Sequence, residues 1–90
     1  MIVEEKNKFV TEADVLKILG HPIRLKIVSG LCSNDCNVKH IWECLGIPQA
    51  IVSQHLARLK RKGIITGKRE GSKVHYSVSN DFAKRVVSLL

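Results

Sequence analysis

The chain has 90 residues, of which 44% are hydrophobic, and a formal net charge of +7. These values fit one small domain, for which dimerisation would add stability because a chain of this length buries little apolar surface. Because the sequence has no apolar run near the roughly 20 residues that span a bilayer, and no signal-peptide core at its start, we expect a cytoplasmic protein with no membrane partner.

The positive charge is concentrated between residues 49 and 76. This segment holds seven basic residues and one acidic residue, which gives six of the seven net charges, whereas residues 1–48 are balanced. An anionic partner is therefore expected. A membrane-surface helix would need a wide apolar face with bulky aromatics, and the chain has only four aromatic residues. The pattern favours nucleic acid, and a solvated basic face without a partner is the alternative.

Two helices are predicted in the first third of the chain. Thr11 can cap the first helix, which Gly20 ends. The dipeptide His21-Pro22 begins the second, because a proline in a first turn loses no intrahelical hydrogen bond. Its apolar residues recur at helical spacing until about Cys32, where turn-forming residues follow.

The next two helices form a helix-turn-helix pattern over residues 37–61. Asn37 can cap the third helix, and Gly46 ends it. The fourth follows over residues 49–61 and ends at Gly63. Two helices joined by a short glycine-containing turn, the second of them basic on its outer side, are typical of a DNA-binding helix-turn-helix.

Residues 64–78 predict a β-hairpin, with β-branched strands at 64–68 and 74–78 and a turn at 69–73. A last helix over residues 80–90 has a wide apolar face, which we expect to pack with the first helix, residues 11–20, across a two-fold dimer axis. The predicted fold is mainly α with a small β-hairpin. It is a winged helix-turn-helix of about five helices plus a two-stranded wing, in a single domain of residues 1–90 that forms a homodimer.

Four runs of the sequence resemble the ArsR/SmtB family of winged-helix repressors. The runs are residues 19–27, 38–47, 52–59 and 63–76. They lie in one register without gaps, and the match covers residues 13–85. The resemblance implies a homodimer that binds double-stranded operator DNA with an inverted repeat and is released when a metal ion, metalloid or oxidant occupies its sensor site.

The outward face of the fourth helix is the predicted DNA-reading surface. The first turns of a recognition helix contact base edges, and a glutamine side chain suits adenine. The expected base readers are Gln49, Ala50, Ser53 and Gln54. Basic residues further along should contact the DNA backbone. These are Arg58, Lys60, Arg61, Lys62, Lys68, Arg69 and Lys73. The resemblance makes His55 a phosphate-contacting or turn-packing residue, and a satisfied histidine at the helix edge is the alternative.

The cysteines are the candidate sensor. The two cysteine positions of the arsenic-type members align with Asn37 and Lys39, so that metal motif is absent. Cys32 and Cys36 flank a turn, and a helix N-terminus would favour the thiolate of Cys36. These two are the candidate sensor thiols, for oxidation or persulfidation.

A metal site is a further possibility for the same region. His40 and Cys44 are four residues apart on a helix and could join Cys32 and Cys36 in a soft site for zinc, arsenite or another thiophilic ion. Cysteines that merely pack around a turn are the alternative. Three cysteines in a chain without export features argue against a disulfide framework and predict mostly reduced thiols.

Together these patterns predict a sequence-specific transcriptional regulator, a repressor released from its operator by thiol oxidation, persulfidation, a metal or a metalloid. An enzyme is not expected, because no histidine–carboxylate pair can be placed beside a cysteine. The alternative function is a winged-helix protein-interaction module that binds nucleic acid only non-specifically.

Overall fold

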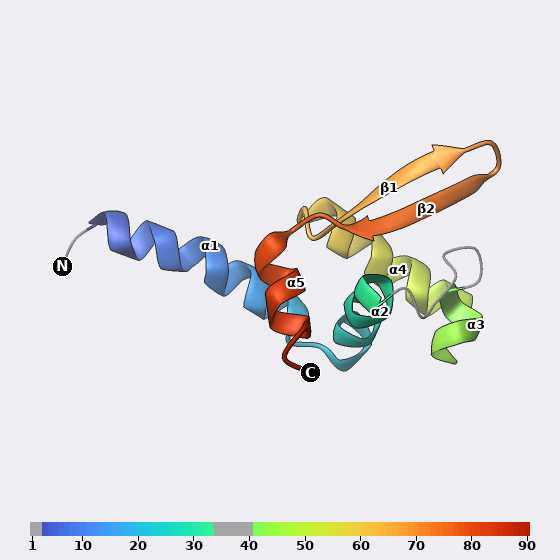
Figure 1. Cartoon of the computed structure of the whole chain (residues 1–90), viewed down its shortest axis with the longest axis horizontal. Coiled ribbons are helices and arrows are strands. Elements are labelled where there is room, and N and C mark those ends of the chain that lie inside the picture. The colour runs from blue at the N-terminus through green and yellow to red at the C-terminus, as the bar shows by residue number, and fades with distance from the viewer. Residues whose placement is uncertain (1–2, 34–40) are drawn as a thin grey trace.

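The computed structural model describes residues 3–33 and 41–90, and it contains five helices and one two-stranded sheet in that part of the chain (Figure 1). This arrangement confirms the predicted mainly α winged helix-turn-helix. The elements are α1 (Val3–Leu19), α2 (Pro22–Ser33), α3 (Ile41–Leu45), α4 (Gln49–Arg61), β1 (Ile65–Glu70), β2 (Lys73–Val78) and α5 (Asp81–Val87).

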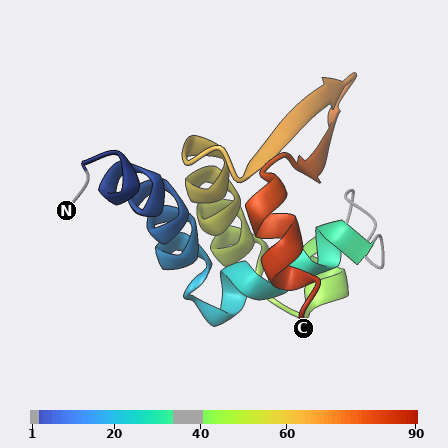
Figure 2. The ribbon, with the colours of Figure 1, turned by 60° about the vertical axis from the view of Figure 1, so that its left-hand side comes forward.

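Helix α2 lies at the centre of the hydrophobic core. Ile27 and Val28 are fully buried, and α2 packs against α1, α3, α4, α5 and strand β2. In Figure 2, α5 lies across α2, and Figure 1 shows the N-terminal part of α1 projecting away from the other helices. The core is thus assembled around one helix, with Leu59 of α4 and Ile64 just after it also fully buried.

Helices α2 and α4 begin where the sequence predicts, but α1 does not. It begins at Val3, so the expected cap at Thr11 is wrong. Residues 3–10 contain no glycine or proline, and nothing in that run stops a helix from extending. The added turns expose Phe9, whose side chain is 64% accessible. The predicted cap of the third helix, Asn37, lies outside the described residues.

The hairpin has longer strands and a tighter turn than expected. The strands extend to Glu70 and Lys73, which face each other in the antiparallel register, so the predicted turn at 69–73 shrinks to two residues. Gly71 in that turn has φ +64°, a backbone conformation that residues other than glycine rarely adopt. At the base of the hairpin, the Ile64 carbonyl accepts hydrogen bonds from the amides of Ser79 and Asn80, at 2.9 and 3.3 Å.

Helix α5 begins as predicted and ends earlier. The Asn80 side chain caps it, since its Oδ1 accepts a 2.8 Å hydrogen bond from the Ala83 amide. The helix ends at Val87 rather than at residue 90. Ala83 and Val87 are buried in the core, whereas Leu89 and Leu90 are 85% and 78% exposed. Some of the apolar residues of this segment therefore pack in the core, and others are exposed at the surface.

Leu59→Ala should lower the free energy of unfolding by roughly 2–5 kcal/mol, because it leaves a cavity at a fully buried position. Chemical denaturation followed by circular dichroism measures the change. Lys60→Ala, at the exposed neighbouring position, is the matched control and should cost under ~0.5 kcal/mol. Equal losses in the two variants would contradict this description of the core.

Candidate nucleic-acid interface

The four predicted base readers share one exposed surface on the first turns of α4. The opposite side of the helix is closed, because Val52, Leu56 and Leu59 are buried in the core. The four residues on the exposed surface are Gln49, Ala50, Ser53 and Gln54. The first turn contains no acidic residue, so nothing there repels a polyanion. All four side chains are uncharged, so this surface of the helix can approach the edges of DNA bases.

The basic residues follow the readers along the chain. Arg58, Lys60 and Arg61 occupy the last turn of α4, Lys62 comes directly after it, and all four are exposed. Lys68 and Arg69 are exposed on β1. Lys73 begins β2 opposite Glu70, and its side chain lies outside the described part of the structure. The hairpin thus extends the basic surface beyond the end of α4.

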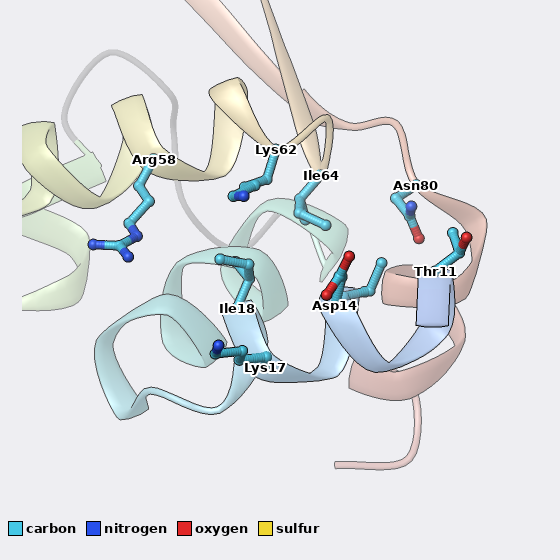
Figure 3. A pocket seen from close by; sticks show the side chains of 9 residues that line it. Thr11, Asp14, Lys17, Ile18, Arg58, Lys62, Ile64 and Asn80 are labelled. Atoms are coloured by element: carbon cyan, nitrogen blue, oxygen red, sulfur yellow. The ribbon is translucent and has the colours of Figure 1, made fainter. Parts of the chain in front are cut away.

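Two of these basic residues also line a pocket between α4 and α1. Figure 3 shows Arg58 and Lys62 from the α4 side and Asp14 and Lys17 from α1 around one hollow. The hollow has a volume of about 340 Å³, and Ile64 contributes to its lining. Arg58 and Lys62 therefore lie on the flank of α4 that faces α1. They form a separate group from the readers on the outer face.

His55 is held by residues of the α1–α2 region. Arg24 Nε donates a 3.2 Å hydrogen bond to His55 Nδ1, and Arg24 Nη1 donates at 3.1 Å to the Ile18 carbonyl near the end of α1. The rings of His21 and His55 lie with their centroids 4.6 Å apart. The geometry favours the packing role over a backbone contact, which stays a prediction. The sequence alone assigns no functional role to Arg24 or His21. Both lie in the segment 19–27, which resembles the ArsR/SmtB family.

The surroundings of His55 favour the neutral form of its ring. Partial burial lowers the pKa of His55 below its ordinary value of 6.5, and the positive charges of His21, Arg24 and Arg58 lower it further. Nδ1 must be unprotonated to accept from Arg24. A proton on this ring would therefore remove a hydrogen bond and add a positive charge among basic neighbours.

The described cysteines differ from the expected arrangement. Cys44 on α3 is disulfide-bonded, whereas Cys32 is a free thiol at the end of α2. A bond between Cys32 and Cys36 is therefore not the one formed, and the expectation of mostly reduced thiols does not hold for Cys44. Partial burial raises the pKa of the Cys32 thiol above its ordinary value, and the positive charge of Lys84 on α5 offsets part of the rise. Cys32 is exposed as a residue, but its thiol is not activated.

The metal prediction stays open. Within residues 3–33 and 41–90, no group of three His, Cys, Asp or Glu side chains could hold a metal ion. Cys36 and His40, two of the four proposed ligands, lie outside these ranges. In the same part of the chain, no helix is long and apolar enough to cross a membrane.

Comparisons with known proteins point to one family. A sequence model described as "Bacterial regulatory protein, arsR family" matches residues 21–66. The matched segment begins at His21 and ends in β1, so it contains the four readers and the contact between Arg24 and His55.

Two relatives match along nearly the whole chain. The transcriptional repressor PagR of Bacillus anthracis is 34% identical over 94 residues, which cover 100% of this chain and 94% of that protein. The PagR crystal structure has a TM-score of 0.82 and covers 93% of this chain and 97% of its own. The transcriptional activator HlyU of Vibrio cholerae is 33% identical over 91 residues, which cover 100% of this chain and 84% of that protein. A structure of reduced HlyU has a TM-score of 0.83 and covers 97% of this chain and 93% of its own.

A third structure is described with its oligomeric state. The solution structure of the homodimeric winged helix-turn-helix DNA-binding domain of Mb0332 from Mycobacterium bovis has a TM-score of 0.79 at 25% identity. It covers 99% of this chain and 82% of its own.

Thermal stability should depend on the protonation of His55. Because folding lowers the pKa of this ring, the unfolded chain binds the proton more readily, and stability is lost as the pH falls below 6.5. Melting temperatures of the wild type and His55→Gln, measured from about pH 7.5 to about pH 5.5, should show a steeper acid loss in the wild type. Parallel curves would show that His55 does not titrate differently on folding.

Proposed function

This chain belongs to the ArsR family of bacterial regulatory proteins, and we propose that it is a homodimeric repressor that binds an inverted-repeat operator and leaves it when its thiols are oxidised. Members of this family are DNA-binding transcriptional regulators and not enzymes. The observation that carries the proposal is the order of side chains on α4, where exposed uncharged residues precede an exposed basic end.

The order of side chains along α4 separates the residues that contact bases from those that contact phosphates. Gln54 and its neighbours on the first turns can hydrogen-bond to base edges in a major groove, which is wide enough to admit a helix. Lys60 and Arg61 lie one to two turns further and contact phosphates, which orient the protein without reading sequence. Lys68 and Arg69 on the hairpin extend the contact to the neighbouring backbone.

The dimer is supported by uncovered apolar side chains on the two terminal helices. Phe9 and Leu16 of α1 are 64% and 48% exposed, and Leu89 and Leu90 follow α5 almost fully exposed. Helices α1 and α5 pack on each other, so these side chains belong to one region of the molecule. A second copy would cover them, and two copies related by a two-fold axis would read two half-sites of opposite direction.

Redox control is supported by the position of Cys44. It forms a disulfide on α3, the first helix of the helix-turn-helix, one residue before the buried Leu45. Because α3 packs against α4, making or breaking this bond can change the support of the recognition helix. Forming it from two thiols transfers two electrons and two protons to an oxidant such as hydrogen peroxide, whose O–O bond breaks to give two water molecules. Cys36, which lies outside the described residues, stays a candidate sensor thiol, and Cys32 is a weaker candidate because its thiol pKa is raised.

Gln54→Ala should weaken binding to a selected duplex about tenfold, because a bidentate base contact contributes roughly 1–3 kcal/mol of discrimination. The duplex is the one that the wild type enriches from a random library, and fluorescence anisotropy at about 150 mM salt measures affinity. Affinity for a random duplex should not change.

Ser72→Ala, in the hairpin turn, removes a polar side chain away from α4 and is the control. If the wild type binds the selected duplex no more tightly than a random one, the chain is instead an interaction module with non-specific affinity.

Cys44→Ser should abolish the response of DNA binding to oxidation. Wild type and the matched control Cys32→Ser should release the selected duplex on hydrogen peroxide treatment and regain it with dithiothreitol, because both keep the cysteine at position 44 that forms the disulfide. The same anisotropy assay measures release. Loss of the response in Cys32→Ser with retention in Cys44→Ser would reverse the assignment.

A further inference from the structure

Arg24 connects three parts of the molecule through one side chain. It lies on α2 and donates to the Ile18 carbonyl of α1 at 3.1 Å and to His55 Nδ1 of α4 at 3.2 Å. Its partner on α4 directly follows the reader Gln54 in sequence. A single guanidinium therefore links the end of one terminal helix to the half of α4 that we assign to base reading.

We propose that Arg24 is a positioning residue for DNA recognition, which fixes the rotation of α4 through His55, and that a proton on His55 releases this link and weakens selective DNA binding. The inference rests on the proposed DNA-binding function, and it adds a residue and a regulatory input that the proposed thiol control does not contain.

The apolar contacts of α4 set which face of the helix points into the core, and a polar contact at the reading half adds to them. Val52, Leu56 and Leu59 anchor the helix to the core, but hydrophobic burial is non-directional. Among the described residues, the bond between Arg24 and His55 is the only side-chain hydrogen bond that ties α4 to another helix. Pro48 precedes α4 and gives it no side-chain cap. The bond to His55 is therefore the directional polar contact that holds the reading turns of α4 against α2.

The surroundings of His55 make the link sensitive to protons. The groups that act on it are His21 from the α1–α2 connection, Arg24 from α2 and Arg58 from α4 itself, and all three are basic. A protonated imidazole donates from both nitrogens and can no longer accept from Arg24. The same proton places a positive charge beside a guanidinium, so the contact changes from attraction to repulsion. The lowered pKa of His55 reflects this environment.

Release of α4 at low pH and a general gain of positive charge should change DNA affinity in opposite directions. Added positive charge on the protein surface strengthens non-specific DNA binding. Release of α4 should instead weaken selective binding. The informative quantity is therefore the ratio of affinities for the selected and random duplexes, measured at the same pH and salt.

Arg24→Gln tests the positioning role by fluorescence anisotropy with those two duplexes. The expected result is a loss of about tenfold in the affinity ratio, the usual effect of one charge-assisted hydrogen bond. The matched control is Lys26→Gln, which removes the same charge from an exposed position on the same helix and should change the ratio less than about twofold. The slope of log affinity against log salt should stay at the wild-type value in Arg24→Gln. A slope lower by about one charge would show that Arg24 contacts a phosphate directly, which overturns the positioning role.

His55→Gln tests the proton sensitivity, because glutamine keeps an acceptor for Arg24 and does not titrate. In the wild type the ratio should fall between about pH 7.5 and about pH 5.5, and in His55→Gln it should stay level. If Arg24→Gln does not fold by circular dichroism, this variant alone decides. An unchanged wild-type ratio over this range, or the same fall in both proteins, overturns the proposal. A wild type without any selective binding would instead refute the DNA-binding function itself, so the two failures are distinguishable.

Discussion

Burial of one face of α2 is the constraint on which the other elements depend. Ile27 and Val28 are fully buried, and the helix that carries them touches all four other helices and β2. A domain of 90 residues has a small core, so few positions can be lost without loss of cooperative folding. The same helix also carries Arg24, which means that the element at the centre of the core is in polar contact with the recognition helix. The same helix thus supports both the packing of the core and a polar contact to α4.

The basic segment divides into parts with different structural surroundings. The readers on the first turns of α4 face outward, whereas Arg58 and Lys62 lie beside Asp14 and Lys17 of α1 around a hollow. Charge alone would treat every lysine and arginine between residues 49 and 76 as equivalent. The fold makes those near α1 sensitive to the position of a terminal helix. Sensitivity of this kind suits a regulator, because a change in the position of α1 can be transmitted to Arg58 and Lys62.

The sequence predicts an element well when local chemistry marks its ends. Helix α4 matches its predicted range because Pro48 and Gly63 bracket a regular apolar pattern. The start of α1 was wrong because residues 3–10 carry no such mark, and the hairpin turn was too long because the polar residues near Gly71 look like a loop. The bond between Arg24 and His55 joins residues 31 positions apart, and the disulfide at Cys44 likewise depends on proximity in space. Local pattern carries no information about either contact.

The base of the hairpin has a consequence for how operator preference can evolve. Ser79 and Asn80 donate to the Ile64 carbonyl, and the Ser79 hydroxyl donates to the Gly63 carbonyl at 3.1 Å, directly after α4 ends. The base of the wing is therefore tied to the residues that directly follow α4, by two backbone hydrogen bonds and one from a serine hydroxyl. The tip of the wing, at Gly71 and Ser72, is exposed and takes no part in the core. Apart from Gly71, whose positive φ favours glycine, the exposed tip can therefore change in sequence while the buried core stays intact.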